Sequence, residues 1–216
     1  MPQDDAEALK WYRQAAEQGD ANAQFHLGLM YAEGKGVPQD YAEALKWYRR
    51  AAERGDANAQ FNLGDMYAAG EGVRKDDAEA LKWYRRAAEQ GNVNHQFFLG
   101  LMHAEGLGVP QDDAEALKWY RRAAEEGDAV AQFQLGDMYH EGDYHEGEGW
   151  GVPQDYIQAH MWFNLAAANL PTGEELRDRA VEARNNVEEL MTPAQIAEAQ
   201  RLAREWMAAY EKRKKK

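Results

Sequence analysis

The segment AEALKWYRRAAERG, residues 42–55, decides the fold of this chain because nearly the same letters return at a fixed spacing. Its aromatic pair recurs every 36 residues, at Trp11-Tyr12, Trp47-Tyr48, Trp83-Tyr84 and Trp119-Tyr120. Residues 5–40 and 41–76 are identical at 27 of 36 positions. A fifth pair, Trp162-Phe163, follows 43 residues after the fourth. A repeat of this length is typical of solenoids built from helix pairs.

The sequence pattern of each repeat predicts two helices. The first follows a capping-box pattern, an aspartate N-cap with a glutamate three residues later, at Asp4, Asp40, Asp76 and Asp112. It ends at a glycine able to adopt the left-handed conformation, at Gly19, Gly55, Gly91 and Gly127. The second helix is capped by Asp20 and its equivalents and runs to about Tyr31. The Gly-x-Gly-Val turn at residues 34–37 then returns the chain to the next repeat.

A glycine recurs inside every second helix, at Gly28, Gly64, Gly100 and Gly136. Glycine costs about 1 kcal/mol relative to alanine inside a helix, so its recurrence predicts a structural reason. We expect a neighbouring helix, or the aromatic pair, to approach the bare backbone there. We also expect the Trp-Tyr pairs to be buried between repeats.

The pattern Ala-x-x-Trp-Tyr-x-x-Ala-Ala-x-x-Gly, then Ala-x-x-x-Leu-Gly-x-x-Tyr and Gly-x-Gly-Val, is similar to the Sel1-like repeat, a relative of the tetratricopeptide repeat. The resemblance covers residues 5 to about 168. It implies an all-α fold, a right-handed α-α superhelix (solenoid) of helix-turn-helix repeats. We place the array at 4–170, with repeats at about 5–40, 41–76, 77–112 and 113–155 and a half repeat at 156–169.

The fifth copy predicts a C-terminal helical cap. Its polar positions have become Met161, Leu165 and Ala168, so something is expected to cover that face. Two amphipathic segments follow, a helix from about residue 174 to Leu190 and another after the capping box at Thr192. We assign residues 171–211 to this two-helix cap, because terminal repeats need one for solubility. The block of like charge at 212–216 is expected to be a disordered basic tail.

The resemblance implies that the first helices line a concave face. Rows of exposed basic and polar residues on that face are the candidate partner-binding residues: Lys10, Gln14, Lys46, Arg50, Lys82, Arg86, Lys118 and Arg122. The competing interpretation is a solvated face of Glu–Lys and Glu–Arg pairs, each worth a few tenths of a kcal/mol. For the whole face we favour a non-enzymatic scaffold or adaptor that binds a peptide or protein.

Two alternatives stay open. A regulator of a single enzyme, an inhibitor or a chaperone-like binder, would use a narrow spot such as Phe98 and Leu101. A metal-dependent module would use the His/Glu-rich insertion at 140–146, with His140, His145 and Glu146 as ligands. A tandem duplication of Tyr-His-Glu-Gly explains that insertion without a metal. No nucleophile–base pattern or phosphate loop is visible, so we expect no catalysis and no cofactor.

The amino-acid composition limits the kinds of partner that we expect. The chain has 25 basic and 38 acidic residues, a formal charge of −13, which disfavours nucleic acid. It has no cysteine and no apolar run long enough to span a membrane. Residues 2–6 repeat at 110–114, so we suspect that upstream repeats or a signal peptide were removed. Periplasmic, secreted and cytoplasmic locations of a bacterial protein stay open, and a monomer is favoured over an oligomer.

Overall fold

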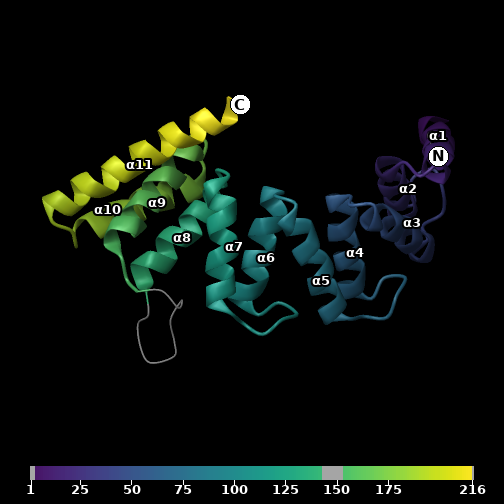
Figure 1. Ribbon diagram of the computed structural model, residues 1–216, viewed down its shortest axis with the longest axis horizontal. Helices are drawn as coiled ribbons and strands as arrows, with labels where there is room; N and C mark the ends of the chain where they lie inside the picture. Colours follow the sequence, from purple (N-terminus) through teal and green to yellow (C-terminus); the bar gives the residue numbers. More distant parts are fainter. Residues whose placement is uncertain (1–2, 143–152, 216) are drawn as a thin grey trace. The chain divides into compact units, whose positions relative to one another are not determined.

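A computed structural model describes residues 3–142 and 153–215, and all regular structure in these residues is α-helical (Figure 1). The prediction of an all-α fold made of repeated helix pairs is confirmed. The helices are α1 (Gln3–Glu17), α2 (Ala21–Glu33), α3 (Tyr41–Glu53), α4 (Ala57–Ala69), α5 (Asp77–Glu89), α6 (Val93–Glu105), α7 (Asp113–Glu125), α8 (Ala129–Glu141), α9 (Tyr156–Asn169), α10 (Glu175–Glu188) and α11 (Pro193–Lys214).

The chain divides into two compact units, Met1–His95 and Gln96–Lys216. Unit 1 contains α1 to α5 and the first turn of α6, and unit 2 contains the rest of α6 and α7 to α11. Within unit 1 each helix packs on the next along the chain, and the same holds for α7, α8 and α9 in unit 2. The boundaries that the sequence suggested between array and cap stay a prediction.

Aspartates begin the first helices of the second, third and fourth copies as expected, and Asp155 does the same in the fifth copy. The Asp40 side chain accepts the amides of Ala42 and Glu43 at 3.0 Å. The backbone amide of Asp40 donates to the carbonyl of Tyr31 at 2.9 Å, and the amides of Asp76, Asp112 and Asp155 make the same bond to the preceding helix. Since that amide is already used, the reciprocal half of the capping box does not form, and this part of the prediction is wrong. Asp4 lies inside α1 and is not its N-cap; no preceding helix among the described residues holds it extended.

The helical glycines confirm the expected close approach. A Cβ atom on Gly28 would stand 2.6 Å from Cδ1 of Tyr48, and one on Gly64 would stand 2.7 Å from Cδ1 of Tyr84. Gly100 meets Tyr120 and Gly136 meets Phe163 in the same way. The second aromatic residue of each pair therefore lies directly on the backbone of the preceding second helix. Real Cβ atoms do not come this close, so alanine cannot enter without a shift.

The predicted burial of the aromatic pairs holds from the second copy on. Trp47 packs with Ala16, Ala23 and Leu27 of the preceding repeat and is 9% exposed. Trp83 packs in the same way on a cluster that includes Ala52 and Leu63. Trp11 differs, since 60% of it is exposed. Trp47 and Trp83 are thus buried by the repeat that precedes each of them.

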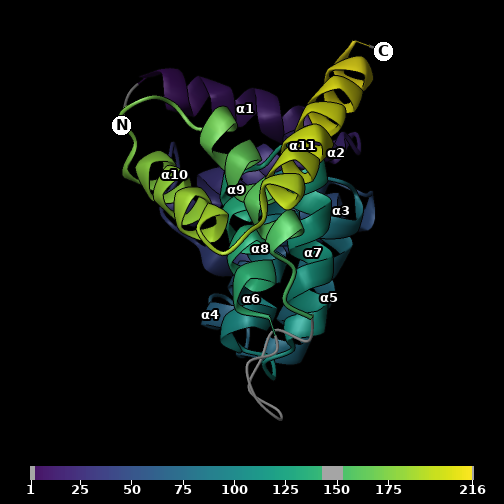
Figure 2. The same ribbon diagram turned by 90° about the vertical axis from the view of Figure 1, so that its left-hand side faces the viewer.

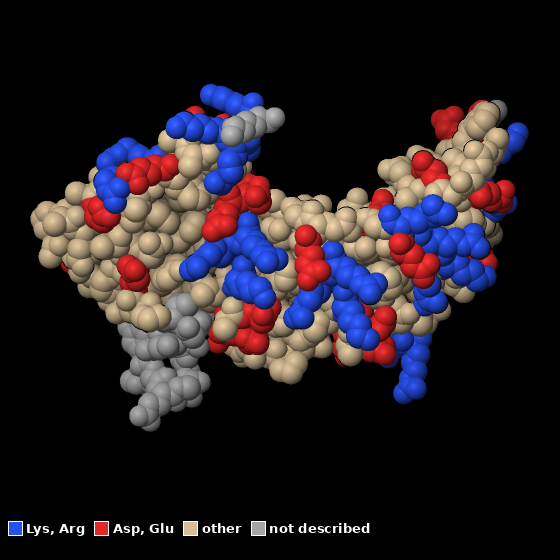
Figure 3. Space-filling view, in the orientation of Figure 1, with Lys and Arg blue, Asp and Glu red and all other residues tan. Residues whose placement is uncertain are grey.

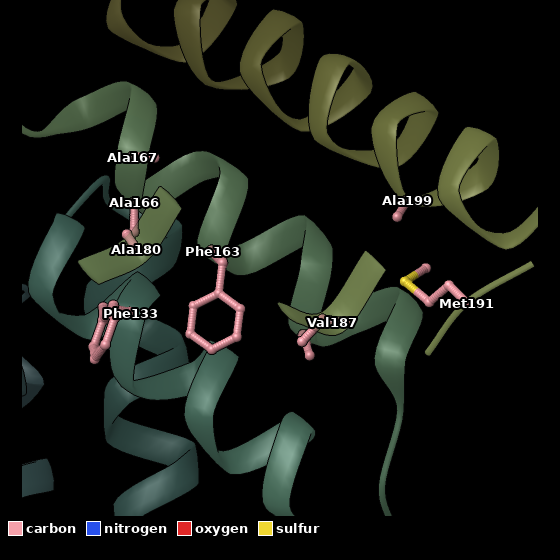
Figure 4. Packing of buried hydrophobic residues seen from close by; sticks show 9 residues of the cluster. Phe133, Phe163, Ala166, Ala167, Ala180, Val187, Met191 and Ala199 are labelled. Carbon is pink, nitrogen blue, oxygen red and sulfur yellow. The ribbon is translucent and has the colours of Figure 1, made fainter. Parts of the chain in front are cut away.

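Helices α10 and α11 cover α9, as the apolar fifth copy predicted. Figure 2 shows α9 between α10 and α11, and both pack against it. Figure 4 shows Phe133 of α8 and Phe163 of α9 with Val187 of α10 and Ala199 of α11 in one buried cluster. Met161 and Leu165 are buried. Ala168 is exposed, contrary to expectation, because the last turns of α11 bond to the end of α7 instead of α9.

Two other details differ from the sequence prediction. The second helices extend about two residues past Tyr31 and its equivalents, to Glu33 in the first copy. Leu190 is 56% exposed because α10 ends at Glu188 and the helical register does not continue.

The expected disordered tail is wrong for residues 212–214, which complete α11. Tyr210 Oη donates to the carbonyl of Glu126 at 2.9 Å, and Arg213 Nη2 donates to that of Glu125 at 2.8 Å. These carbonyls lie at the C-terminal end of α7, where helical carbonyls lack partners and a cation is favoured. Tyr210 and Arg213 therefore attach the end of α11 to α7.

Candidate functional site

All eight candidate binding residues are exposed on first helices of the repeats. Six lie in unit 1, on α1, α3 and α5, and two, Lys118 and Arg122, lie on α7 in unit 2. Figure 3 shows basic and acidic side chains side by side in groups over these helices. On α7 both basic residues lie over one tryptophan, with Lys118 Nζ 5.8 Å and Arg122 Cζ 4.6 Å from the ring centroid of Trp119.

The lysines of the second, third and fourth copies are paired inside their own helices. Lys46 Nζ lies 2.5 Å from Glu43 Oε1, and Lys82 Nζ lies 2.8 Å from Glu79 Oε2. Lys118 makes the same pair with Glu115 at 2.9 Å. The hydrogen bond to the glutamate and its charge raise the pKa of Lys46 and of Lys82. Exposed pairs of this kind contribute only a few tenths of a kcal/mol, so a partner can compete for these lysines.

The arginine row stacks on the tryptophans. The Cζ atoms of Arg50, Arg86 and Arg122 lie 4.6, 4.7 and 4.6 Å from the ring centroids of the tryptophans three residues earlier. A guanidinium above an aromatic face is held by the ring quadrupole, while its N–H edges stay available to carboxylates. Within residues 3–142 and 153–215 no ion pair involves these three arginines. They form the same basic platform in three repeats.

Sequence reasoning treated the tryptophans only as core residues and missed their second role under the arginines. The signal was present, since Trp and Arg are three residues apart and such residues are neighbours on a helix. The first copy lacks the platform because Gln14 stands where the others have arginine. Trp11 beside it is exposed.

A second arginine row is structural. Arg13 Nη2 donates to Tyr31 Oη at 2.6 Å, and Arg49 Nη2 donates to Tyr67 Oη at 2.7 Å. Arg121 bonds to Tyr139 in the same way. These bonds tie the first helix of a repeat to its second helix. Adjacent arginines of one motif therefore differ in role: one bonds to a tyrosine of the second helix and the next stacks on a tryptophan. The sequence does not distinguish them.

The alternative spot on α6 is not an exposed patch. Phe98 and Leu101 are both half-buried. At the position of Leu101 the second repeat has Asp65, whose Oδ1 accepts the hydroxyl of Tyr84 at 2.7 Å. Burial, followed by this bond, raises the pKa of Tyr84, so the phenol stays protonated and donates. This position therefore faces the next repeat and not only solvent.

The metal alternative stays a prediction. His145 and Glu146 lie outside the described residues, and His140 lies on α8 with its ring 6.1 Å from that of Tyr156. No group of three or more metal-ligating side chains occurs in the described part of the chain. His26, His95 and His160 contact neighbouring side chains, and the ring of His95 stacks on Phe61 with the centroids 4.6 Å apart. Burial lowers the pKa of His95.

None of the helices in the described ranges combines the length and the apolar character that a membrane span requires.

Comparison with known proteins identifies the family. The model of the Sel1 repeat matches residues 1–20, 21–56, 57–92, 96–128 and 129–169. A protective antigen of uropathogenic Escherichia coli with this repeat fold is 37% identical, with a TM-score of 0.70. A Sel1 repeat protein of Oxalobacter formigenes is 36% identical, with a TM-score of 0.66. A comparison with curated proteins found no match.

The two matches cover different shares of the proteins compared. The match to the E. coli antigen covers 94% of this chain but 41% of the antigen. The match to the O. formigenes protein covers 86% of this chain and 77% of that protein. Sel1 repeat proteins are generally protein-interaction scaffolds and are typically not enzymes. With the family model matched over most of its length, the chain belongs to the Sel1 repeat family.

Proposed function

We propose that this chain is a non-enzymatic interaction module that binds a peptide segment of another protein along its first helices, on the face expected to be concave. The observation that supports this proposal is the platform of a guanidinium on a buried indole, repeated on α3, α5 and α7. The tryptophans themselves are core residues, but a solvated face has no need of an arginine over each of them at the same position. The platform therefore favours binding over simple solubility.

The chemistry of the platform defines the partner. A stacked guanidinium keeps its planar edge of N–H donors, which match a carboxylate in a bidentate manner. The Glu43–Lys46 and Glu79–Lys82 pairs beside it are exposed and can re-pair with charges of either sign. We therefore expect a peptide with acidic side chains at the arginines and other polar groups between them.

The test replaces the three arginines together. Arg50→Glu, Arg86→Glu and Arg122→Glu in one chain should weaken binding of peptides selected from a random phage-displayed library by more than about tenfold, because charged hydrogen bonds are lost. Affinities are measured by calorimetry with synthetic copies of the peptides selected on the wild type. Helicity, followed by circular dichroism, should stay unchanged because the three side chains are exposed.

A charge-matched control separates the platform from net charge. Arg74→Glu, Arg204→Glu and Lys212→Glu change the charge equally at exposed positions outside the first helices of the repeats. This control should bind as the wild type does. An equal loss of affinity in both triple variants would mean that long-range electrostatics explains the effect. No loss of affinity in either variant would mean that the peptide does not bind to the first helices.

A further inference from the structure

A buried glutamine joins the two helices of most repeats. Gln24, Gln60 and Gln132 occupy one position of the second helix, and each is at most 7% exposed. Their Nε2 atoms donate to the carbonyls of Ala16, Ala52 and Ala124 at 3.0, 3.0 and 3.1 Å. Those carbonyls belong to the last turn of the first helix, and each also accepts a backbone amide, from Gly19, Gly55 and Gly127. The amide nitrogen of this glutamine thus has one fixed structural task.

The other end of the glutamine is satisfied by the next repeat. Gln60 Oε1 accepts from Gln90 Nε2 at 2.7 Å. Gln132 Oε1 accepts from Asn169 Nδ2 at 2.9 Å. Both donors are primary carboxamides at the end of the following first helix. Two interfaces, one in each unit, therefore make the same carboxamide-to-carboxamide bond.

The first interface lacks this donor. Arg54 stands at the position of Gln90, and its guanidinium lies over Gly19, with Nη2 3.0 Å from where a Cβ of Gly19 would be. Gln24 Oε1 is buried and meets no donor within the described part of the chain. An unsatisfied buried acceptor is costly, and native proteins rarely leave one without a reason.

Gln24 is one of the residues that line a surface pocket of about 330 Å³. The charged residues that line the pocket are Glu17, Arg50, Glu53 and Arg54. Two carboxylates and two guanidinium groups have formal charges that cancel, so neither a cation nor an anion is favoured overall. A neutral group with both donors and an acceptor suits this lining. Arg50 also belongs to the arginine row, which connects the pocket to the proposed binding face.

We propose that this pocket is a subsite for a primary carboxamide, the side chain of an asparagine or glutamine in the bound peptide. Its N–H group donates to Gln24 Oε1, as Gln90 does to Gln60, and its carbonyl accepts from the guanidinium groups that line the pocket. The inference rests on the proposed peptide-binding function and specifies one position of the ligand.

The test uses two substitutions that remove the same charge. Arg54→Gln places at α3 the residue that α5 has at position 90, so it should close the pocket by bonding to Gln24. Arg54→Met removes the guanidinium but supplies no amide. Peptides selected on the wild-type chain from the random library should share an asparagine or glutamine at one position. Changing that residue to leucine should weaken binding about threefold to tenfold, the effect of one lost hydrogen bond.

The two variants should then differ. Arg54→Gln should bind the peptides about threefold to tenfold more weakly than wild type and make no distinction between the carboxamide and leucine forms. Arg54→Met should still prefer the carboxamide form. Equal behaviour of the two variants, or selected peptides without a shared carboxamide position, would overturn the subsite while leaving the arginine platform intact.

If the library yields no binding peptide, the proposed function is contradicted. The carboxamide subsite is then tested by a separate experiment. Acetamide is titrated into the chain while the side-chain amide signals of Gln24 are followed by NMR, with acetate and methylammonium as controls. Shifts caused by acetamide alone, and absent in Arg54→Gln, support the subsite. An unchanged Gln24 signal overturns it.

Discussion

The packing of α5 on α4 and of α9 on α8 is one interface built twice, with different outer faces. In both, a helical glycine lies under an aromatic ring, Gly64 under Tyr84 and Gly136 under Phe163. On α5 the tryptophan then supports Arg86, which is exposed. On α9 the ring of Trp162 instead contacts Trp206 of α11 at 6.2 Å. The comparison teaches that the inner contacts of a repeat are fixed, whereas its outer face depends on whether another helix covers it.

The largest expected effect concerns the tryptophans. Trp83→Ala should lower the free energy of unfolding by about 3–5 kcal/mol, because the indole fills a core site between repeats. Trp11→Ala should cost less than about 1 kcal/mol, since 60% of that residue is exposed. Urea unfolding followed by circular dichroism measures both. Similar losses at the two positions would show that burial by the preceding repeat does not explain the difference.

The next effect concerns the shared glycine contact. Gly64→Ala should cost about 1–3 kcal/mol, because the new Cβ would stand 2.7 Å from Tyr84. Gly136→Ala should behave alike against Phe163. In a Tyr84→Ala background the cost of Gly64→Ala should vanish, and the better helix propensity of alanine should remain. Additive losses in this double-mutant cycle would mean that the ring is not the obstacle.

The two interfaces also differ in one hydroxyl. Tyr84 donates to Asp65, but Phe163 has no hydroxyl to offer Asp137. Burial, with Glu141 adding to it and Arg179 opposing it, raises the pKa of Asp137 to about 7. A carboxyl with a raised pKa binds its proton more tightly in the folded state. Stability should therefore fall as pH rises from about 4 to about 7 and then level off.

Phe163→Tyr tests this difference. The new hydroxyl should stabilise the carboxylate, gain about 1 kcal/mol at pH 8 and flatten the decline between the two pKa values. Unfolding curves at a series of pH values measure the effect, with Asp137→Asn as the variant that cannot titrate there. Parallel pH profiles of the wild type and Asp137→Asn would exclude Asp137 as the source.

The smallest effect concerns the open face itself. Glu79→Gln breaks the pair with Lys82 and should cost only a few tenths of a kcal/mol. That loss should shrink in high salt, because exposed charges are screened. Urea melts at low and high salt provide the measurement, with the exposed Glu89→Gln as control. A loss above about 1 kcal/mol would mean that the pair is structural and not free to engage a partner.

Most of the fold could be predicted because its determinants are local and repeated. The aspartate caps, the left-handed glycines and the glycine under each aromatic ring depend on short spacings that occur four or five times. The errors at Leu190 and at residues 212–214 have a different origin. They depend on where a helix stops and on the carbonyls of α7, more than 80 residues away in sequence.

The candidate face was predictable only as rows of residues. The sequence gives no reason why Arg49 bonds to a tyrosine while Arg50 stacks on Trp47, since the two arginines are adjacent. Their directions follow from the helical turn of about 100° between neighbours and from what each side then meets. Two adjacent arginines that look alike in the sequence therefore differ in role: Arg49 holds two helices together, whereas Arg50 stays available to a partner.

The sequence by itself determined the repeat, the aspartate caps of the later copies and the family, because each repeat encodes its own caps and its own contact between a glycine and an aromatic ring. The tertiary structure decided which polar groups are satisfied. Gln24, Gln60 and Gln132 have the same local sequence context, and only the residue that follows in the next first helix gives or withholds a donor. Hydrogen bonding of a buried group depends on neighbours brought together by folding, so this distinction becomes visible only in three dimensions.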